Sequence, residues 1–350
     1  MDRDFINKKR DAAFQIKLDK EGGNIMDFMP LGNILYVIRT ESIYEIKTPD
    51  AIDPERKYPN TKAITRKVIG YGTKDSLVYK TLGLAKKILN NVILEDNSKK
   101  DVILNSYFEL LKHIVHLYEL YQRLINEFIK KGKAYDNLIE TSKYDFLPDI
   151  PQIDELEPSI KDFIFSFHKA QKVLLSFFRR MYEDKIGVFT NLDSFVARYS
   201  QYYGENSEWA NTIRTDDIPW WKETWQIRNC LEHPENEVTY IKIYNIEPAP
   251  NNKIMPPSYK YKIKLDNNYK ETEQIDLLRD VEVFLYNIID FSKDALLHTI
   301  KDNCDRNFEW IIYKIAESRI DPDYPCEYEI LPNMSKFDEM IKNAENKTSI

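Results

Sequence analysis

Apolar residues recur every three or four positions over several long stretches of the chain, a spacing that predicts amphipathic helices. The longest stretches span residues 102–131, 159–184 and 274–301. Further helices are predicted at residues 76–94, 191–201 and 218–232. Because such helices bury their apolar faces against one another, we expect a mostly α protein built around a helical bundle.

Other stretches alternate apolar and polar residues with a period of two, which predicts strands. A hairpin is expected from residues 33–38 and 42–47, with a third short strand at 64–69. A second hairpin, from 238–244 and 258–265, should expose lysines on one side, and short strands are expected at 310–315 and 327–331. For residues 1 to about 30, where charged residues alternate with isolated apolar ones, we predict either a loose, irregular start to the chain or a short helix.

The polar residues 96–101 separate these patterns and mark a predicted domain boundary. We expect a small N-terminal α+β region of unknown role over residues 1–95. A helical domain with an inserted β-hairpin should follow over residues 101–301, and a C-terminal extension over 302–350. Residues 70–76 contain two glycines but lack the spacing of a phosphate-binding loop, so we expect a turn that leads into a helix. We find no Walker or dinucleotide pattern and expect no cofactor.

The predicted helix at 218–232 contains the most suggestive chemistry of the chain. Pro219 suits its first turn, Asp216 or Asp217 can cap it, and Pro234 should end it. Arg228, Asn229 and His233 follow near its C-terminal end, where they can converge on one anion.

Arginine matches a phosphate with a planar set of donors, histidine exchanges a proton near neutral pH, and an amide can orient the ring or a ribose hydroxyl. Together these groups could promote attack of a 2′-hydroxyl on its own phosphodiester without a metal. The same residues could instead only cap the last carbonyls of the helix and interact with its dipole.

The run Arg228-Asn229-Cys230-Leu231-Glu232-His233 resembles the signature of HEPN domains, in which an Arg and a polar residue precede a His at the end of a helix. The order of predicted helices over residues 101–301 resembles the same family. The resemblance implies a HEPN-like bundle that forms a homodimer, with two motif helices facing one cleft. It also implies that Arg228 stabilises the scissile phosphate, that His233 acts as acid or base, and that Asn229 orients the ring or the ribose.

Family members with the full motif are typically metal-independent endoribonucleases, often toxins or antiviral-defence effectors. Others have lost the chemistry and act as modules that bind or dimerise. The resemblance therefore implies either an endoribonuclease with an RNA substrate, regulated by an antitoxin or another protein, or a catalytically inactive module that binds a protein or nucleic-acid partner.

The net charge of −7 leaves RNA contacts to a local basic patch. The best candidate for that patch is the cationic face of the helix at 159–184. Lys222, on the helix predicted at 218–232, could add one more positive charge to it. That face carries His168, Lys169, Lys172, Arg179 and Arg180. It could equally be an ordinary solvated face. Trp220, Trp221 and Trp225 could stack on bases, although packing in the bundle is the commoner use.

The three cysteines have no metal-ligand or disulfide spacing, so a reducing cytoplasm is expected. No run of about 18 apolar residues is present, so we expect neither secretion nor a membrane span. Glu109, His113 and His116 have a spacing that could hold a metal, but no partner cluster accompanies them and we expect no metal site.

Overall fold

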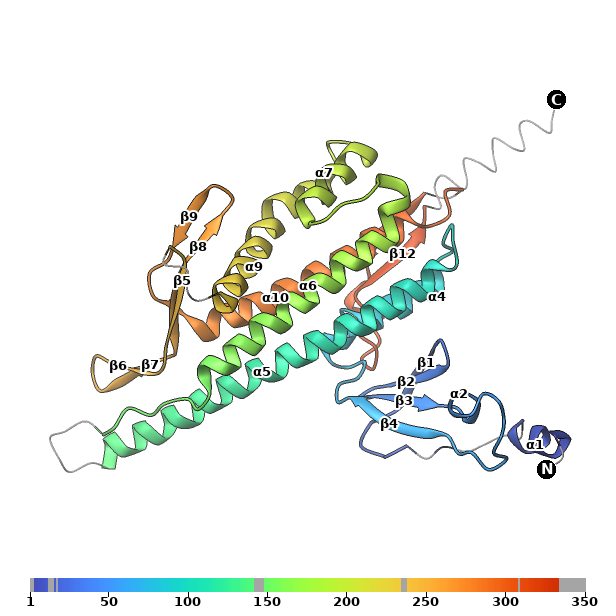
Figure 1. The fold of residues 1–350 in the computed structure, drawn as a ribbon, viewed down its shortest axis with the longest axis horizontal. Helices are drawn as coiled ribbons and strands as arrows, with labels where there is room; N and C mark the ends of the chain where they lie inside the picture. The colour runs from blue at the N-terminus through green and yellow to red at the C-terminus, as the bar shows by residue number, and fades with distance from the viewer. Residues whose placement is uncertain are drawn as a thin grey trace. The chain divides into compact units, whose positions relative to one another are not determined.

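The computed structural model describes residues 3–11, 16, 18–141, 148–233, 238–307 and 309–333. These residues form a mixed α and β protein, with long helices and several small antiparallel sheets (Figure 1). The chain divides into two compact units. Unit 1 comprises residues 1–111 and 292–350, and unit 2 comprises residues 112–291. Both divisions fall within long helices, α5 (Lys99–Thr141) and α10 (Leu277–Asp302).

Unit 1 contains a four-stranded antiparallel sheet in the order β1-β2-β3-β4. The strands are β1 (Ile25–Leu31), β2 (Ile34–Arg39), β3 (Ile43–Lys47) and β4 (Ile64–Ile69). The predicted hairpin and third strand are confirmed, and a short helix is present at Arg3–Arg10, but the loose start or short helix predicted over residues 1 to about 30 did not include β1. Only Met29 and Leu31 of β1 are buried, so this edge strand carries little of the alternation that reveals a strand.

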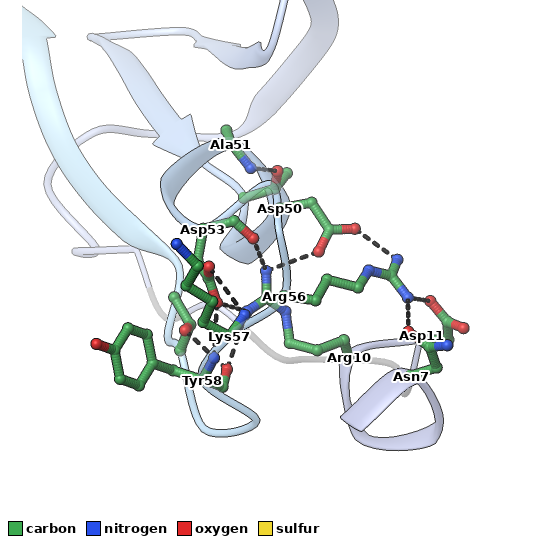
Figure 2. Close-up of polar contacts among 11 residues, drawn as sticks. Asn7, Arg10, Asp11, Asp50, Ala51, Asp53, Arg56, Lys57 and Tyr58 are labelled. Carbon is green, nitrogen blue, oxygen red and sulfur yellow. Dashed lines mark hydrogen bonds and ion pairs between the residues drawn. The ribbon is translucent and has the colours of Figure 1, made fainter. Parts of the chain in front are cut away.

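Buried charges attach the short helix α1 (Arg3–Arg10) to the segment after β3, which begins with α2 (Pro49–Ile52) (Figure 2). The Arg10 side chain is 1% exposed and donates to Asp50 Oδ1 at 2.7 Å and Asp53 Oδ2 at 3.0 Å. Its guanidinium also donates to the Tyr58 carbonyl at 3.0 Å. Arg56 pairs in turn with Asp11 at 2.8 Å and with Asp50 at 2.7 Å. An arginine with this many acceptors can be buried at an acceptable desolvation cost.

The helix predicted over residues 76–94 is broken into α3 (Ser76–Tyr79) and α4 (Leu82–Asn91). Thr81 lies at the break, and its hydroxyl donates to the carbonyls of Leu77 and Val78. A threonine side chain that bonds to the backbone in this way competes with continued helix formation. The turn predicted before this helix is confirmed, because Asp75 caps α3 by accepting from the amide of Leu77 at 2.8 Å. Unit 1 also contains the predicted strand pair, β11 (Trp310–Lys314) with β12 (Tyr328–Pro332).

Unit 2 consists of helices that pack around a core of aromatic side chains. Besides its parts of α5 and α10, it contains α6 (Leu156–Ile186), α7 (Leu192–Tyr203), α8 (Glu208–Thr212) and α9 (Ile218–Glu232). All the long helices expected here are present. Phe178 stacks on Phe195 with ring centroids 4.5 Å apart. Between α6 and α9, the buried Gln171 amide donates to the Trp221 carbonyl at 3.2 Å and the Thr224 hydroxyl at 2.9 Å.

The start of α9 differs from the expected capped N-terminus. A π-helical turn, Ile213–Asp217, leads from α8 directly into α9. The Ile218 amide donates to the carbonyl of Ile213, and Asp217 makes no side-chain cap. The first amides of α9 therefore find acceptors in the preceding turn, and the expected aspartate cap was wrong. At the other end His233 is the C-cap residue, and its amide donates to the Asn229 carbonyl at 3.0 Å. Pro234 lies outside the described residues.

The second predicted hairpin is confirmed as β5 (Tyr240–Tyr244) paired with β8 (Ser258–Leu265). The structure adds β9 (Asn268–Glu271) and β10 (Ile275–Asp276), which both pair with β8, and a small hairpin of β6 (Glu247–Ala249) and β7 (Lys253–Met255). The insertion is thus a small sheet rather than one hairpin. All four residues of β9 are exposed, so no alternation revealed it. Strand β8 packs on α9 and buries Tyr259, Tyr261 and Ile263.

Candidate functional site

Asn229 and His233 line one cavity at the C-terminal end of α9. Its volume is about 370 Å³, and Gln226, Lys264 and Tyr269 also line it. The two motif residues share a face because they are four positions apart on a helix. The inserted sheet supplies the opposite wall through Lys264 of β8 and Tyr269 of β9. The cavity therefore combines an imidazole, an amide, an ammonium group and a phenol.

Ion pairing and hydrogen bonding hold the Arg228 side chain, which is 21% exposed. Its guanidinium donates to Asn229 Oδ1 at 3.1 Å and to Glu232 Oε1 at 2.8 Å. The same group lies 5.9 Å from the centre of the Phe165 ring, and its Nε is buried without a hydrogen-bond partner among the described residues. Arg228 therefore stands beside Asn229 with its charge balanced by Glu232, and a phosphate would have to compete with that carboxylate.

The His233 ring is open to solvent, in contrast with Arg228. Its side chain is 76% exposed, and Nε2 lies 3.7 Å from Glu232 Oε2. As the C-cap residue it has left the helical conformation, with φ −126° and ψ 67°. Glu232 thus lies against both Arg228 and His233, and the exposed imidazole forms part of the cavity wall.

His168 of α6 is a neighbour of this site that the sequence pattern placed wrongly. We expected it on the solvated cationic face, but it is 5% exposed and its ring meets Trp225 edge-on at 4.1 Å between centroids. Burial, and then the positive charges of Lys172 and Arg228, lower the pKa of His168 to about 4. The ring is therefore neutral at pH 7. His168 lies four residues after the buried Ile164 and three residues before the buried Gln171, so the three share one helix face. That spacing was the signal that could have indicated a buried position for His168.

The other predicted RNA-contacting residues differ in what holds them. Lys169, Lys172 and Arg180 are exposed on α6. Arg179 donates to the carbonyls of Phe189 at 3.0 Å and Thr190 at 2.9 Å, so it also anchors the segment before α7. Lys222 lies between two carboxylates, 2.8 Å from Asp193 and 3.1 Å from Asp266.

The three tryptophans of α9 pack mainly within unit 2. Trp220 contacts the rings of Phe167 and Phe291, each at 6.0 Å, and Trp221 is 5% exposed. Trp221 and Trp225 also line a second cavity, of about 260 Å³, on the side of α9 that faces α7. Gln226 lines both this cavity and the one that contains Asn229 and His233.

The spacing of Glu109, His113 and His116 is not accompanied by a metal-ligand cluster. Within the described ranges, no three or more His, Cys, Asp or Glu side chains gather as ligands would. His116 Nε2 lies 3.1 Å from Asp162 Oδ2 on α6. We therefore assign His116 a polar contact between α5 and α6.

None of the helices in the described part of the chain has both the length and the apolar character needed to cross a bilayer. In comparisons with known proteins, no family model matches this chain, and no curated protein or solved structure is significantly similar to it.

Proposed function

We propose that this protein is a metal-independent endoribonuclease of the HEPN type. The observation that carries the proposal is the cavity in which Asn229 and the exposed ring of His233 stand together, with Arg228 directly beside Asn229. Asn229 and His233 thus line one cavity, and Arg228, which does not line it, hydrogen-bonds to Asn229 from the side. The three side chains supply an imidazole, an amide and a guanidinium.

In the proposed reaction the RNA supplies its own nucleophile. The imidazole of His233 accepts the proton of a ribose 2′-hydroxyl as the 2′-oxygen bonds to phosphorus, or donates a proton to the 5′-oxygen as the P–O5′ bond breaks. Arg228 stabilises the charge that develops on the non-bridging oxygens, after the phosphate displaces Glu232 from it. Asn229 orients the ring or the ribose. The products are a 2′,3′-cyclic phosphate and a 5′-hydroxyl.

We further propose that the active form is a homodimer. In a symmetric dimer, a cleft shared by two copies can combine the Arg228 of one protomer with the His233 of its partner, so that each active site draws one group from each chain. The 76% exposure of His233 leaves its ring available to such a shared cleft. We place Lys169, Lys172 and Arg180 along the path of the RNA backbone, where exposed cations attract phosphates. An antitoxin or another regulatory protein is a further proposed partner, in a toxin or antiviral-defence system.

The cytoplasm is the proposed compartment. Cys230, Cys304 and Cys326 are all buried and none forms a disulfide. Free buried thiols are typical of proteins that stay under reducing conditions.

A catalytically inactive binding module is the second candidate, and one contact favours it. Arg228 is already paired with Glu232 and bonded to Asn229, as expected of an arginine that only stabilises the end of its helix. In that case the cavity would bind a protein or nucleic-acid partner without cleaving it.

The first test is cleavage of a mixed RNA pool by the purified protein in EDTA. We expect cyclic phosphate ends, and we expect His233→Ala and Arg228→Ala each to slow cleavage at least about 100-fold, the lower range for loss of an acid–base group or a charge stabiliser. His116→Ala is the matched control, because His116 also contacts a carboxylate on the surface of unit 2 but lies outside the cavity.

Cleavage that persists in both motif variants would overturn the assignment of the site. If the parent protein binds RNA and leaves it intact, alone and with cell extract as a source of activator, the inactive module is the better description. Thermal unfolding of each variant checks that a loss of activity is not a loss of fold.

A further inference from the structure

The second cavity beside α9 has the construction of a site for a flat aromatic ligand. It lies among α6, the first turn of α7, α9 and the turn between β8 and β9, all within unit 2. Leu175, Leu192, Trp221 and Trp225 supply its apolar lining. At about 260 Å³ the cavity is just below the roughly 300–1,000 Å³ of pockets for drug-sized ligands, and its apolar walls with a few polar groups suit a smaller ligand such as one planar ring system.

Both tryptophans in its wall are held in place by their neighbours. Trp221 meets Phe291 edge-on with ring centroids 5.4 Å apart, and Trp225 meets His168 edge-on at 4.1 Å. Aromatic rings held in fixed positions lose little conformational freedom when a ligand stacks on them. The wall therefore suits a planar ring system.

The polar side of the cavity disfavours a phosphate and favours a ligand group that donates hydrogen bonds. Lys222 is bracketed by Asp193 at 2.8 Å and Asp266 at 3.1 Å, so two carboxylates outnumber one ammonium group. The resulting negative balance repels an anion, while the free lone pairs of the two carboxylates can accept from an amino group. Gln226 adds an amide that can both donate and accept.

The position of the cavity relates it to the motif. Gln226 lines both cavities, and Trp225 and Asn229 are four residues apart on α9, or about 6 Å along the helix axis. Adjacent parts of one RNA chain can therefore occupy the two cavities together, with a phosphate beside Asn229 and His233 and a base against the tryptophans.

We infer that this second cavity binds a nucleobase bearing an exocyclic amino group, which adenine, cytosine and guanine have and uracil lacks, next to the phosphate that the motif contacts. The assignment of the neighbouring phosphate rests on the proposed ribonuclease function, whereas recognition of the base rests on the cavity alone. The cavity thereby provides the enzyme with a preference for the base at the cleavage position.

Binding of free nucleosides tests the cavity apart from catalysis. Adenosine, cytidine and uridine are titrated into the full-length protein and followed by isothermal calorimetry, so that no phosphate or cleavage contributes. We expect adenosine and cytidine to bind more tightly than uridine. Trp225→Leu should weaken binding at least about fivefold, the lower end for loss of one base–aromatic stack. Trp310→Leu, in unit 1, is the matched control.

A charge-removing variant tests the preference between bases. Asp266 has a positive φ of 51°, a conformation that asparagine also tolerates, so Asp266→Asn removes the charge and keeps the turn. We expect Asp266→Asn combined with Asp193→Asn to reduce the preference for adenosine over uridine, with unchanged thermal unfolding.

His233→Ala separates this inference from the proposed function. Nucleoside binding that survives in His233→Ala and is weakened in Trp225→Leu supports the base site, even if the parent protein cleaves no RNA. No nucleoside binding at millimolar concentration, or equal binding by the parent and Trp225→Leu, overturns the inference, and RNA cleavage by the same protein would leave the ribonuclease proposal intact.

Discussion

His168 illustrates at the scale of one residue how packing alters acid–base behaviour. Its ring is buried against Trp225, and that burial, with Lys172 and Arg228 nearby, lowers the pKa to about 4. The negative charge of Glu232 favours the protonated ring and raises the pKa of His168, but this effect is smaller than the lowering by burial and by the two positive charges. The neutral ring is therefore part of the surface on which α6 and α9 meet.

This shift predicts a loss of stability in acid. In the unfolded chain the histidine is protonated below pH ~6.5, whereas in the folded protein it is protonated only near pH 4. Between these values the unfolded state binds more protons, so the free energy of unfolding falls as the pH decreases from about 6.5 to 4. Above that window this contribution is fully present.

Urea unfolding at pH 7 and pH 4.5 measures the effect. We expect His168→Phe, which keeps a ring against Trp225, to reduce the difference between the two pH values by on the order of 1 to 2 kcal/mol. Identical pH dependence of the parent and His168→Phe would contradict the assignment.

At the scale of elements, the short helix α1 is attached chiefly through the buried side chain of Arg10. The helix has eight residues, too few to be stable without tertiary contacts. Of its residues, Ile6 and Arg10 are buried, and Arg10 reaches Asp50 and Asp53 (Figure 2). The attachment of α1 therefore relies on charge-assisted hydrogen bonds more than on apolar burial.

Arg10→Met should lower the free energy of unfolding by about 2 to 3 kcal/mol, because Asp53 loses a buried partner while the half-exposed Asp50 is rehydrated. Hydrogen exchange should become faster in α1 than in the sheet. The adjacent Lys9→Ala removes an exposed contact to Asn60 and should cost less than 1 kcal/mol. Similar costs for the two substitutions would argue against the role of Arg10.

At the scale of the whole molecule, the proposed homodimer predicts complementation between inactive variants. If two copies share one cleft, a dimer of Arg228→Ala with His233→Ala retains one intact Arg228 and one intact His233. Unfolding and refolding the two variants together should form about half mixed dimers and restore part of the activity. Each variant refolded alone should stay inactive. No gain on mixing, with dimers detected by sedimentation, would indicate that each chain acts independently.

Local signals were enough to predict most elements. The bounds of α9 matched the predicted 218–232, because a proline in the first turn and a regular apolar stripe are properties of neighbouring residues. The two predicted hairpins and the two short strands near residues 310 and 330 were also correct, because alternation of apolar and polar residues is likewise a property of neighbouring residues. Elements with weak local signals, β1 and β9, were missed, and the helix broken at Thr81 was predicted as continuous.

The sequence by itself determined most of the secondary structure, the motif Arg228, Asn229 and His233, and the resemblance on which the proposed function is based. Only the tertiary structure decided what surrounds that motif. It pairs Arg228 with Glu232, buries His168 against Trp225, and brackets Lys222 with Asp193 and Asp266. Periodicity describes the face on which a side chain lies, whereas charge balance, burial and cavities depend on residues that are distant in the chain and meet only in the fold.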